Sequence, residues 1–302
     1  MKKLNHQTCL RCRYGNQVIK STNINSVLRQ VESRWLQILY EHVKELFSQT
    51  WLPSHDHIHH LRVWIHAKNL VEALSVSGYS FTEQKLKQLV IAAFFHDTGL
   101  TRTLDASHGK ESRKICHDYL AKMPQFSSED YKEILDAVEK HDDKSYRSLP
   151  ANEQRQPDNL LTILTVSDDL DAYGAIGVYR YLEIYVLRAI PLWLIPSKII
   201  ENISKRYNYL VQNYSELEDF IKVQQKRYQY TVRFFSEMEK QYNSMKDITI
   251  NTGPAGTVNL LIQQTLTEKI HYTALEPVNK NLSLDQFSIN YFKQLQKECK
   301  HG

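Results

Sequence analysis

Apolar residues recur along most of the chain at the three- and four-residue spacing that is typical of amphipathic helices. Only 9 Gly and 8 Pro interrupt these patterns in 302 residues, so breaks between them are few. The sequence therefore predicts an all-α protein. We expect helices at about 26–49, 54–74, 82–96, 108–120, 128–141, 160–171, 199–245 (more than one), 258–271 and 284–298, with 251–257 as a loop.

The pattern also divides the chain into three parts. Residues 1–25 show no periodicity and are expected to form a poorly ordered tail, in which Cys9 and Cys12 make only half of a zinc-ribbon spacing. Residues 26–190 form the first helical part, and 191–302 form a second one rich in tyrosine and charge. We expect the second part to be a cap over a site or a dimerisation region, which would make the protein a homo-oligomer.

Charge, cysteine content and hydropathy limit the partners and the cellular compartment that we expect for the protein. A formal net charge of +4 permits an anionic substrate but does not indicate a nucleic-acid partner. Four cysteines in a chain of this length do not indicate a disulfide framework, so we expect a reducing, cytoplasmic location. The most apolar stretch, 181–195, is interrupted by Glu183, Arg188 and Pro191, so no membrane association is expected.

Residues 92–100 carry the first sign of chemistry. An apolar run ends in His96 and Asp97, and Thr98 and Gly99 then break it. Buried ionisable groups are costly unless they are paired or bind a metal. The rest of the sequence is therefore expected to supply partners for this pair.

The most histidine-dense segment, 54–64, is one source of partners. Ser54 is expected to cap its helix, on which His55, His59 and Arg62 share one face. His57 and His60 point elsewhere and are expected at the surface.

Further candidates lie in the next three helices. His108 starts a helix, a core-facing stripe ends in a second histidine, and carboxylates follow a buried-looking run at 160–167. Imidazole and carboxylate together suit Mn, Fe, Ni, Zn or Co better than calcium. Such residues from separate helices can surround an ion and leave positions open for water, which is typical of a catalytic metal site. The candidate ligands are His59, His96, Asp97, His108, His141 and Asp168.

Three motifs in this order resemble those of a known family, the HD-domain metal-dependent phosphohydrolases. They are His-Asp-x-x-His-x-x-Arg-Val at 55–63, Phe-His-Asp-Thr-Gly at 95–99, and Asp-Asp-Leu-Asp-Ala-Tyr-Gly-Ala-Ile-Gly-x-x-Arg at 168–180. The last resembles the Leu-Asp-Ala-x-Gly-Ala-Ile-Gly motif of small nucleotide phosphatases and pyrophosphatases. The resemblance covers about 54–180 and implies that 26–190 is a helical HD domain with a metal site.

The resemblance also implies which residues bind metal. Carried over residue by residue, it makes His59, His96, Asp97 and Asp168 the ligands of one divalent ion, with Mn, Fe, Ni, Co, Mg or Zn as the candidates. His108 and His141 fall where two-metal members of the superfamily place additional histidines. One ion is expected, and a second ion bridged by Asp97 remains an open alternative.

A metal-bound water and nearby cations would then complete the chemistry. Asp97 would hold the metal that activates the water, while Arg102, Lys110 and Arg180 would bind a phosphate group, with Lys110 also stabilising charge in the reaction. Asp171, one turn after Asp168, is expected either to orient the water or accept its proton, or to form an ion pair with Arg62.

Three classes of function follow from these residues. The favoured one is hydrolysis of a phosphate ester or anhydride in a small molecule, such as a nucleotide. A second is a di-iron oxygenase, because a minority of the superfamily uses six ligands in this order for that chemistry. The third is a regulatory or binding protein with a vestigial site. Fold-level resemblance alone does not decide among them.

Overall fold

The computed structural model describes residues 24–123, 128–143, 156–244, 252–275 and 284–301. These ranges contain helices and no strand, which confirms the all-α prediction. The elements are α1 (Ile24–Phe47), α2 (His57–Val76), α3 (Glu83–Phe95), η2 (Thr98–Thr101), α4 (His108–Leu120), α5 (Ser128–Lys140), α6 (Leu160–Asp171), α7 (Gly174–Leu187), η5 (Leu192–Leu194), α8 (Ile195–Tyr214), α9 (Glu218–Ser244), α10 (Gly253–Leu261), η6 (Ile262–Thr267), η7 (Tyr272–Ala274) and α11 (Gln286–His301).

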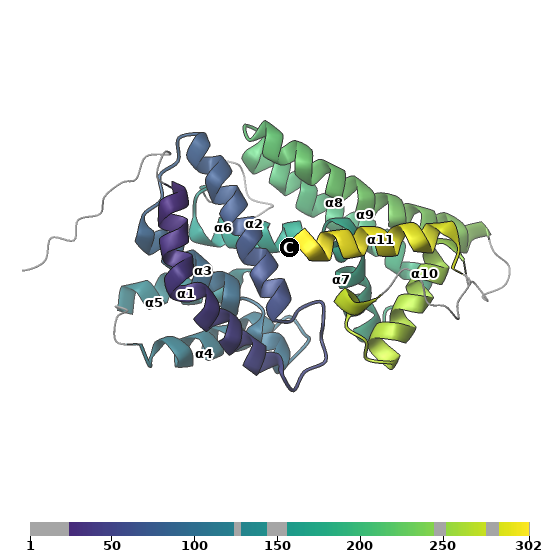
Figure 1. The fold of residues 1–302 in the computed structure, drawn as a ribbon, viewed down its shortest axis with the longest axis horizontal. Helices are drawn as coiled ribbons and strands as arrows, with labels where there is room; N and C mark the ends of the chain where they lie inside the picture. The colour runs from purple at the N-terminus through teal and green to yellow at the C-terminus, as the bar shows by residue number, and fades with distance from the viewer. Residues whose placement is uncertain (1–23, 124–127, 144–155, 245–251, 276–283, 302) are drawn as a thin grey trace, which may run out of the picture.

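The first six α-helices form a bundle in which α3 contacts all the others (Figure 1). Helix α2 packs against α1, α3 and α6, while α4 packs against α5. The side chains of Val63, Trp64 and Leu70 on α2 are fully buried, as are Phe94 and Phe95 at the end of α3. The apolar stripes that predicted these helices therefore form the core of the bundle.

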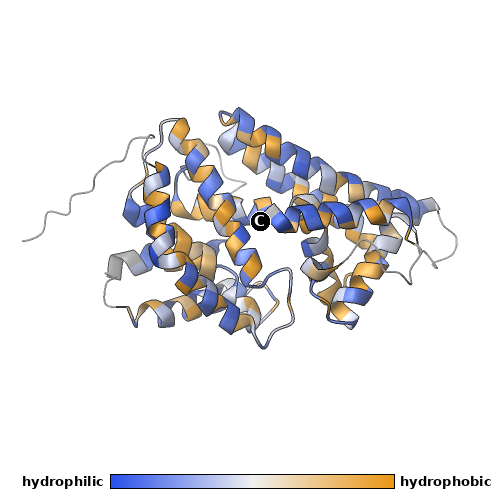
Figure 2. Ribbon diagram, in the orientation of Figure 1, coloured by the Kyte–Doolittle hydropathy of each residue, from blue (hydrophilic) through white to orange (hydrophobic). Residues whose placement is uncertain are grey.

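Helices α7 to α11 form a second group beside the bundle (Figure 1). Helix α9 lies along α8 and also packs against α7 and α10, and α11 packs against α7 and α10. Polar and apolar residues alternate along α8 and α9, as expected for helices that bury only one face (Figure 2). None of the helices within the described ranges is long and apolar enough to cross a membrane.

Two sets of hydrogen bonds hold the C-terminal helices, one to α7 within the second group and one to the connection before α2. The carboxylate of Glu298 on α11 accepts hydrogen bonds from the backbone N–H groups of Ala175 and Ile176, at 3.0 and 3.1 Å, and so caps the start of α7. The indole of Trp51 donates to the carbonyl of Thr265, at 2.7 Å. The C-terminal helices are thus anchored where α7 begins and where α2 is about to begin.

Two local predictions were wrong. The N-cap of α2 is Asp56, whose carboxylate accepts a hydrogen bond from Ile58 N at 2.9 Å, whereas Ser54 bonds to the side chain of Glu183. Residues 253–257, expected in a loop, begin α10, because Pro254 occupies a first-turn position that needs no N–H donor.

Some expectations cannot be compared with the structure. The tail with Cys9 and Cys12 lies outside the described residues. The first helix begins at Ile24 and the fifth at Ser128, close to the predicted starts.

Helices α4 and α5 approach each other closely at Gly109. A Cβ atom at Gly109 would lie 2.4 Å from the carbonyl oxygen of Glu139 on α5, too close for any side chain. Helix α4 begins with His108, and His141 directly follows α5. Because Gly109 has no side chain, α4 and α5 can lie this close, and their spacing sets the distance between the candidate ligands His108 and His141.

We expect Gly109→Ala to destabilise the protein by about 1–3 kcal/mol, because the two backbones must separate. Helix propensity alone predicts the opposite sign, since Ala is favoured over Gly inside a helix by about 1 kcal/mol. The melting temperature measured by calorimetry distinguishes the two. Lys110→Ala, at the exposed neighbouring position, is the control and should leave the melting temperature nearly unchanged. A rise in melting temperature for Gly109→Ala would contradict the close approach.

Candidate metal centre

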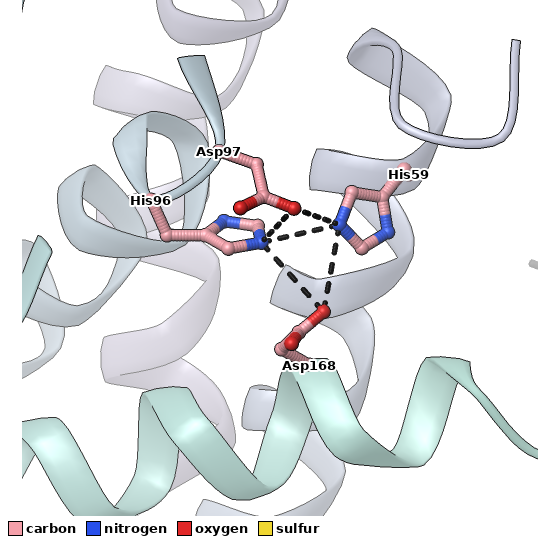
Figure 3. Close-up of side chains that lie close together, drawn as sticks. All are labelled: His59, His96, Asp97 and Asp168. Carbon is pink, nitrogen blue, oxygen red and sulfur yellow. Dashed lines mark hydrogen bonds and ion pairs between the residues drawn. The ribbon is translucent and has the colours of Figure 1, made fainter. Parts of the chain in front are cut away.

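Four of the predicted ligands meet in one place. His59 comes from the first turn of α2, His96 and Asp97 directly follow α3, and Asp168 lies near the end of α6. Their side chains point toward one another across the bundle (Figure 3). We call this group the first cluster.

The donor atoms of the first cluster are spaced as metal ligands are. The Nε2 atoms of His59 and His96 are 3.1 Å apart, and Oδ2 of Asp97 is 3.4 Å from each. Oδ1 of Asp168 is 3.6 Å from His59 Nε2 and 3.8 Å from His96 Nε2. Donors about 2.0–2.2 Å from a first-row ion are about 2.8–3.6 Å apart at octahedral or tetrahedral angles. All of these distances except the longest, 3.8 Å between Asp168 and His96, lie in this range, so the residues present fit a divalent metal ion after a small adjustment of Asp168.

A second cluster shares Asp97 with the first. The other carboxylate oxygen of Asp97, Oδ1, lies 2.9 Å from Nε2 of His141 and 3.4 Å from Nε2 of His108. All three side chains are buried. One carboxylate thus faces two separate groups of donors with its two oxygens, which is the arrangement that a bridging ligand between two ions requires.

All four histidines present Nε2 to the clusters because their Nδ1 atoms are used elsewhere. His96, His108 and His141 each donate from Nδ1 to a backbone carbonyl three residues earlier, at 2.8–2.9 Å. His59 donates from Nδ1 to Oδ2 of Asp171, at 2.8 Å. A hydrogen bond of this kind fixes the tautomer and leaves a lone pair on Nε2 for a metal.

The electrostatics of the clusters favour a bound cation. Burial raises the pKa of Asp97, but the charge of His96 and hydrogen bonds from His108 and His141 hold it well below its usual range. Burial lowers the pKa of His96, but Asp97 and Asp168 raise it to about 10. The ionised carboxylates thus draw protons onto buried imidazoles. A divalent cation would offset the same negative charge and displace those protons.

Asp171 lies outside the cavity and contacts the candidate ligand His59. It is fully buried and receives two hydrogen bonds from Arg62, at 2.7 and 2.9 Å, and one from His59. It does not line the cavity at the metal centre. Of the two roles left open by the sequence, the ion pair with Arg62 is the one observed, and Asp171 orients a ligand rather than facing a substrate.

A cavity of about 180 Å³ opens onto both clusters. Asp97, His108, His141 and Asp168 line its floor. Arg180 lines its wall and contacts Oδ1 of Asp168, at 3.1 Å. The predicted phosphate-binding residue Arg180 is therefore placed beside the candidate metal ligands.

Other residues of the cavity wall were not predicted. These further lining residues, on the same helix as Arg180, are Tyr181, Ile184, Tyr185 and the C-cap residue Arg188, which follow the spacing i, i+3, i+4, i+7, together with Asn202 and Arg206 one turn apart on α8. The spacing on α7 continues the third motif and could have indicated a shared face. No local signal in the sequence indicated that α8 would reach the site.

Two predicted phosphate-binding residues lie away from the cavity. Arg102 is exposed and pairs with Glu111, at 3.0 Å. Lys110 is exposed on α4, because it follows His108 by two positions and so points to another side of the helix. Neither residue lines the cavity.

The remaining histidines of the 54–64 segment divide differently from the prediction. His55 lines the cavity, and its Nδ1 lies 2.7 Å from Ser54 Oγ. His57 is partly exposed, as expected. His60 was expected at the surface but is fully buried, where it contacts the carbonyl of Ala93 at 3.2 Å, because α2 is surrounded by neighbouring helices.

Comparison with known proteins agrees with this geometry. The family model of the HD domain matches residues 57–173. No curated protein matches the chain at a significant level, and no solved structure does so. The matched segment contains every donor of both clusters. Residues 57–173 of the chain therefore form an HD domain.

Proposed function

We propose that the protein is a phosphohydrolase that cleaves a phosphate ester or anhydride in a small molecule, with nucleotides and related compounds as the substrate class. One observation carries the proposal. The two oxygens of Asp97 face two groups of histidine and carboxylate donors at the floor of a cavity whose wall carries arginines. This combination suits a reaction in which an activated water attacks a phosphoryl group held by cations.

The first cluster would hold one divalent ion, and Asp97, His108 and His141 would hold a second. Ions at such positions lower the pKa of bound water and offset the charge that develops on phosphoryl oxygens. Asp97 would be common to both ions.

The other residues of the cavity bind and orient the substrate in this proposal. Arg180 and Arg188 would hold phosphoryl oxygens, because guanidinium groups pair with them in a fixed geometry. Ser54 Oγ donates its proton to Glu183, so the Nδ1–H of His55 donates to Ser54 Oγ, and the lone pair on Nε2 would accept a hydrogen bond from a substrate hydroxyl or a bound water. Asp171 would keep His59 oriented toward the first ion.

The di-iron oxygenase remains the second candidate, because the same six donors would suit two irons. Arginines on the cavity wall favour the hydrolase, since an oxygenase needs no phosphate-binding cations. The complete donor set argues against a vestigial site.

We expect Mn-, Mg-, Fe- or Ni-loaded protein to release phosphate, pyrophosphate or a monophosphate from at least one of these substrates: nucleotides, dinucleotides, cyclic nucleotides and sugar phosphates. Asp97→Ala should lower the rate at least about a thousandfold, because the metal-activated water is lost. Asp118→Ala, on the exposed side of α4, is the matched control and should keep full activity. A stoichiometric mixed-valent di-iron centre in aerobically purified protein, without phosphate release, would overturn the hydrolase.

We further expect the protein to bind two metal ions per chain when it is saturated, measured by elemental analysis after gel filtration. The double variant His108→Ala/His141→Ala should retain one, because the first cluster is left intact. His117→Ala removes an exposed histidine from α4 and should retain two. A saturated wild type with a single ion would show that Asp97 does not bridge.

The structure also changes which arginine should affect substrate binding. Arg188 lines the cavity and donates only to the carbonyl of Leu104 among the contacts described. We expect Arg188→Gln to raise KM about tenfold with little change in kcat, because one charge-assisted contact to the substrate is lost. Arg102→Gln should change neither constant. The reverse pattern in steady-state kinetics would restore the role of Arg102 predicted from the sequence.

A further inference from the structure

A second cavity, of about 320 Å³, lies between α2, α7, α9 and α11. It shares no lining residue with the cavity at the metal centre. Its polar wall includes Arg62, His66 and Asn69 from α2 and Arg227 from α9. Nothing in the proposed reaction uses this space.

Arg227 is a charged group with neutral partners. Its guanidinium donates to the side-chain carbonyl of Gln224, at 3.0 Å, and to the backbone carbonyl of Tyr173, at 3.1 Å. Within the described ranges no carboxylate forms an ion pair with it. Burial lowers its pKa and outweighs Glu298 and Asp171, which attract its charge from farther away. Arg227 is partly buried, so an anion in direct contact with it would stabilise its charge further.

Within the described ranges the carboxylate that lines this wall is that of Glu298, and it is engaged in hydrogen bonds. Glu298 accepts hydrogen bonds from the backbone of Ala175 and Ile176 and from Gln294. Arg62 donates to Asp171 and to Tyr272. Among the hydrogen bonds of the described residues, Arg227 therefore has no direct carboxylate acceptor, and Glu298 and Asp171 act on its charge only from a distance.

The rest of the wall is partly apolar. Ile65 and Ile176 line the cavity, and Val223 stands at the same wall with 56% of its surface exposed. Asn69 is exposed beside them. A guanidinium and an amide next to aliphatic side chains suit a ligand with an anionic group at one end and an apolar body at the other.

We propose that this cavity binds a small organic anion, which carries a phosphate, phosphonate or carboxylate group on a compact apolar body. The anionic group would pair with Arg227 and accept a hydrogen bond from Asn69, and the apolar body would contact Ile65, Ile176 and Val223. Arg62 belongs to the wall of this cavity and also holds Asp171, which orients the metal ligand His59. The ligand would thus lie beside Arg62, whose partner Asp171 accepts the hydrogen bond that orients His59.

Phenylphosphonate is a suitable probe, because it has both parts and is not hydrolysed by a phosphatase. We expect it to slow hydrogen–deuterium exchange in peptides that cover the first half of α9, residues 218–230. Arg227→Gln should weaken this protection at least about tenfold in probe concentration, because a charge-assisted contact is lost. Arg233→Gln, at an exposed position on the same helix, is the matched control and should bind as the wild type does.

A second variant covers the case in which Arg227→Gln does not fold. Asn69→Asp places a negative charge at an exposed position of the wall and should also weaken binding about tenfold.

Methylphosphonate, which lacks the apolar body, and benzyl alcohol, which lacks the charge, should each bind more weakly than phenylphosphonate. Protection confined to α7 and α8 that survives Arg227→Gln would place the probe at the metal centre and overturn the proposal. Absence of protection, or equal binding of all three probes, would also overturn it.

Discussion

The negative charge of Asp97 is the constraint on which the site depends. Its carboxylate is almost fully buried, and a buried carboxylate is costly unless several partners offset its charge. One oxygen faces donors from α2, α3 and α6, and the other faces histidines from α4 and α5. Histidines from four helices, α2 to α5, therefore offset the charge of one side chain, whereas the carboxylate of Asp168 on α6 repels it. A shift of any of these four helices would leave part of that charge without a partner.

The positions of the histidines follow from how helices end. The last carbonyls of a helix have no N–H partner within it. His96 and His141 directly follow α3 and α5, and their Nδ1 atoms bond to such carbonyls. His59 lies inside α2, where no free carbonyl is at hand, so it uses the side chain of Asp171 instead. Burying Asp171 in turn requires Arg62, which explains why the first motif contains an arginine and the third an aspartate one turn after Asp168.

The donors could be predicted from the sequence because each is marked locally. Apolar periodicity located the helices, and polar residues at the end of buried runs located His96, Asp97 and Asp168. The phosphate-binding residues could not be predicted in the same way. The direction of Arg102 depends on an ion pair with Glu111, formed only when the loop folds back onto α4. Ser54 is drawn away from the helix start by Glu183, a residue far along the chain.

The site also divides between two parts of the chain. All donors lie within the matched segment 57–173, whereas Tyr181, Tyr185, Arg188 and Arg206 on the cavity wall lie beyond it. In the proposed function the matched segment would supply the metal ligands, and α7 and α8 would contact the rest of the substrate. A cavity of about 180 Å³ is smaller than a typical pocket for an organic ligand, about 300–1,000 Å³. A nucleotide-sized substrate would thus fill it with the phosphate and extend past Arg188 toward Leu104 and Asp105, where a neighbouring hollow shares Arg188. Substrate choice then depends on residues at that opening more than on the metal ligands.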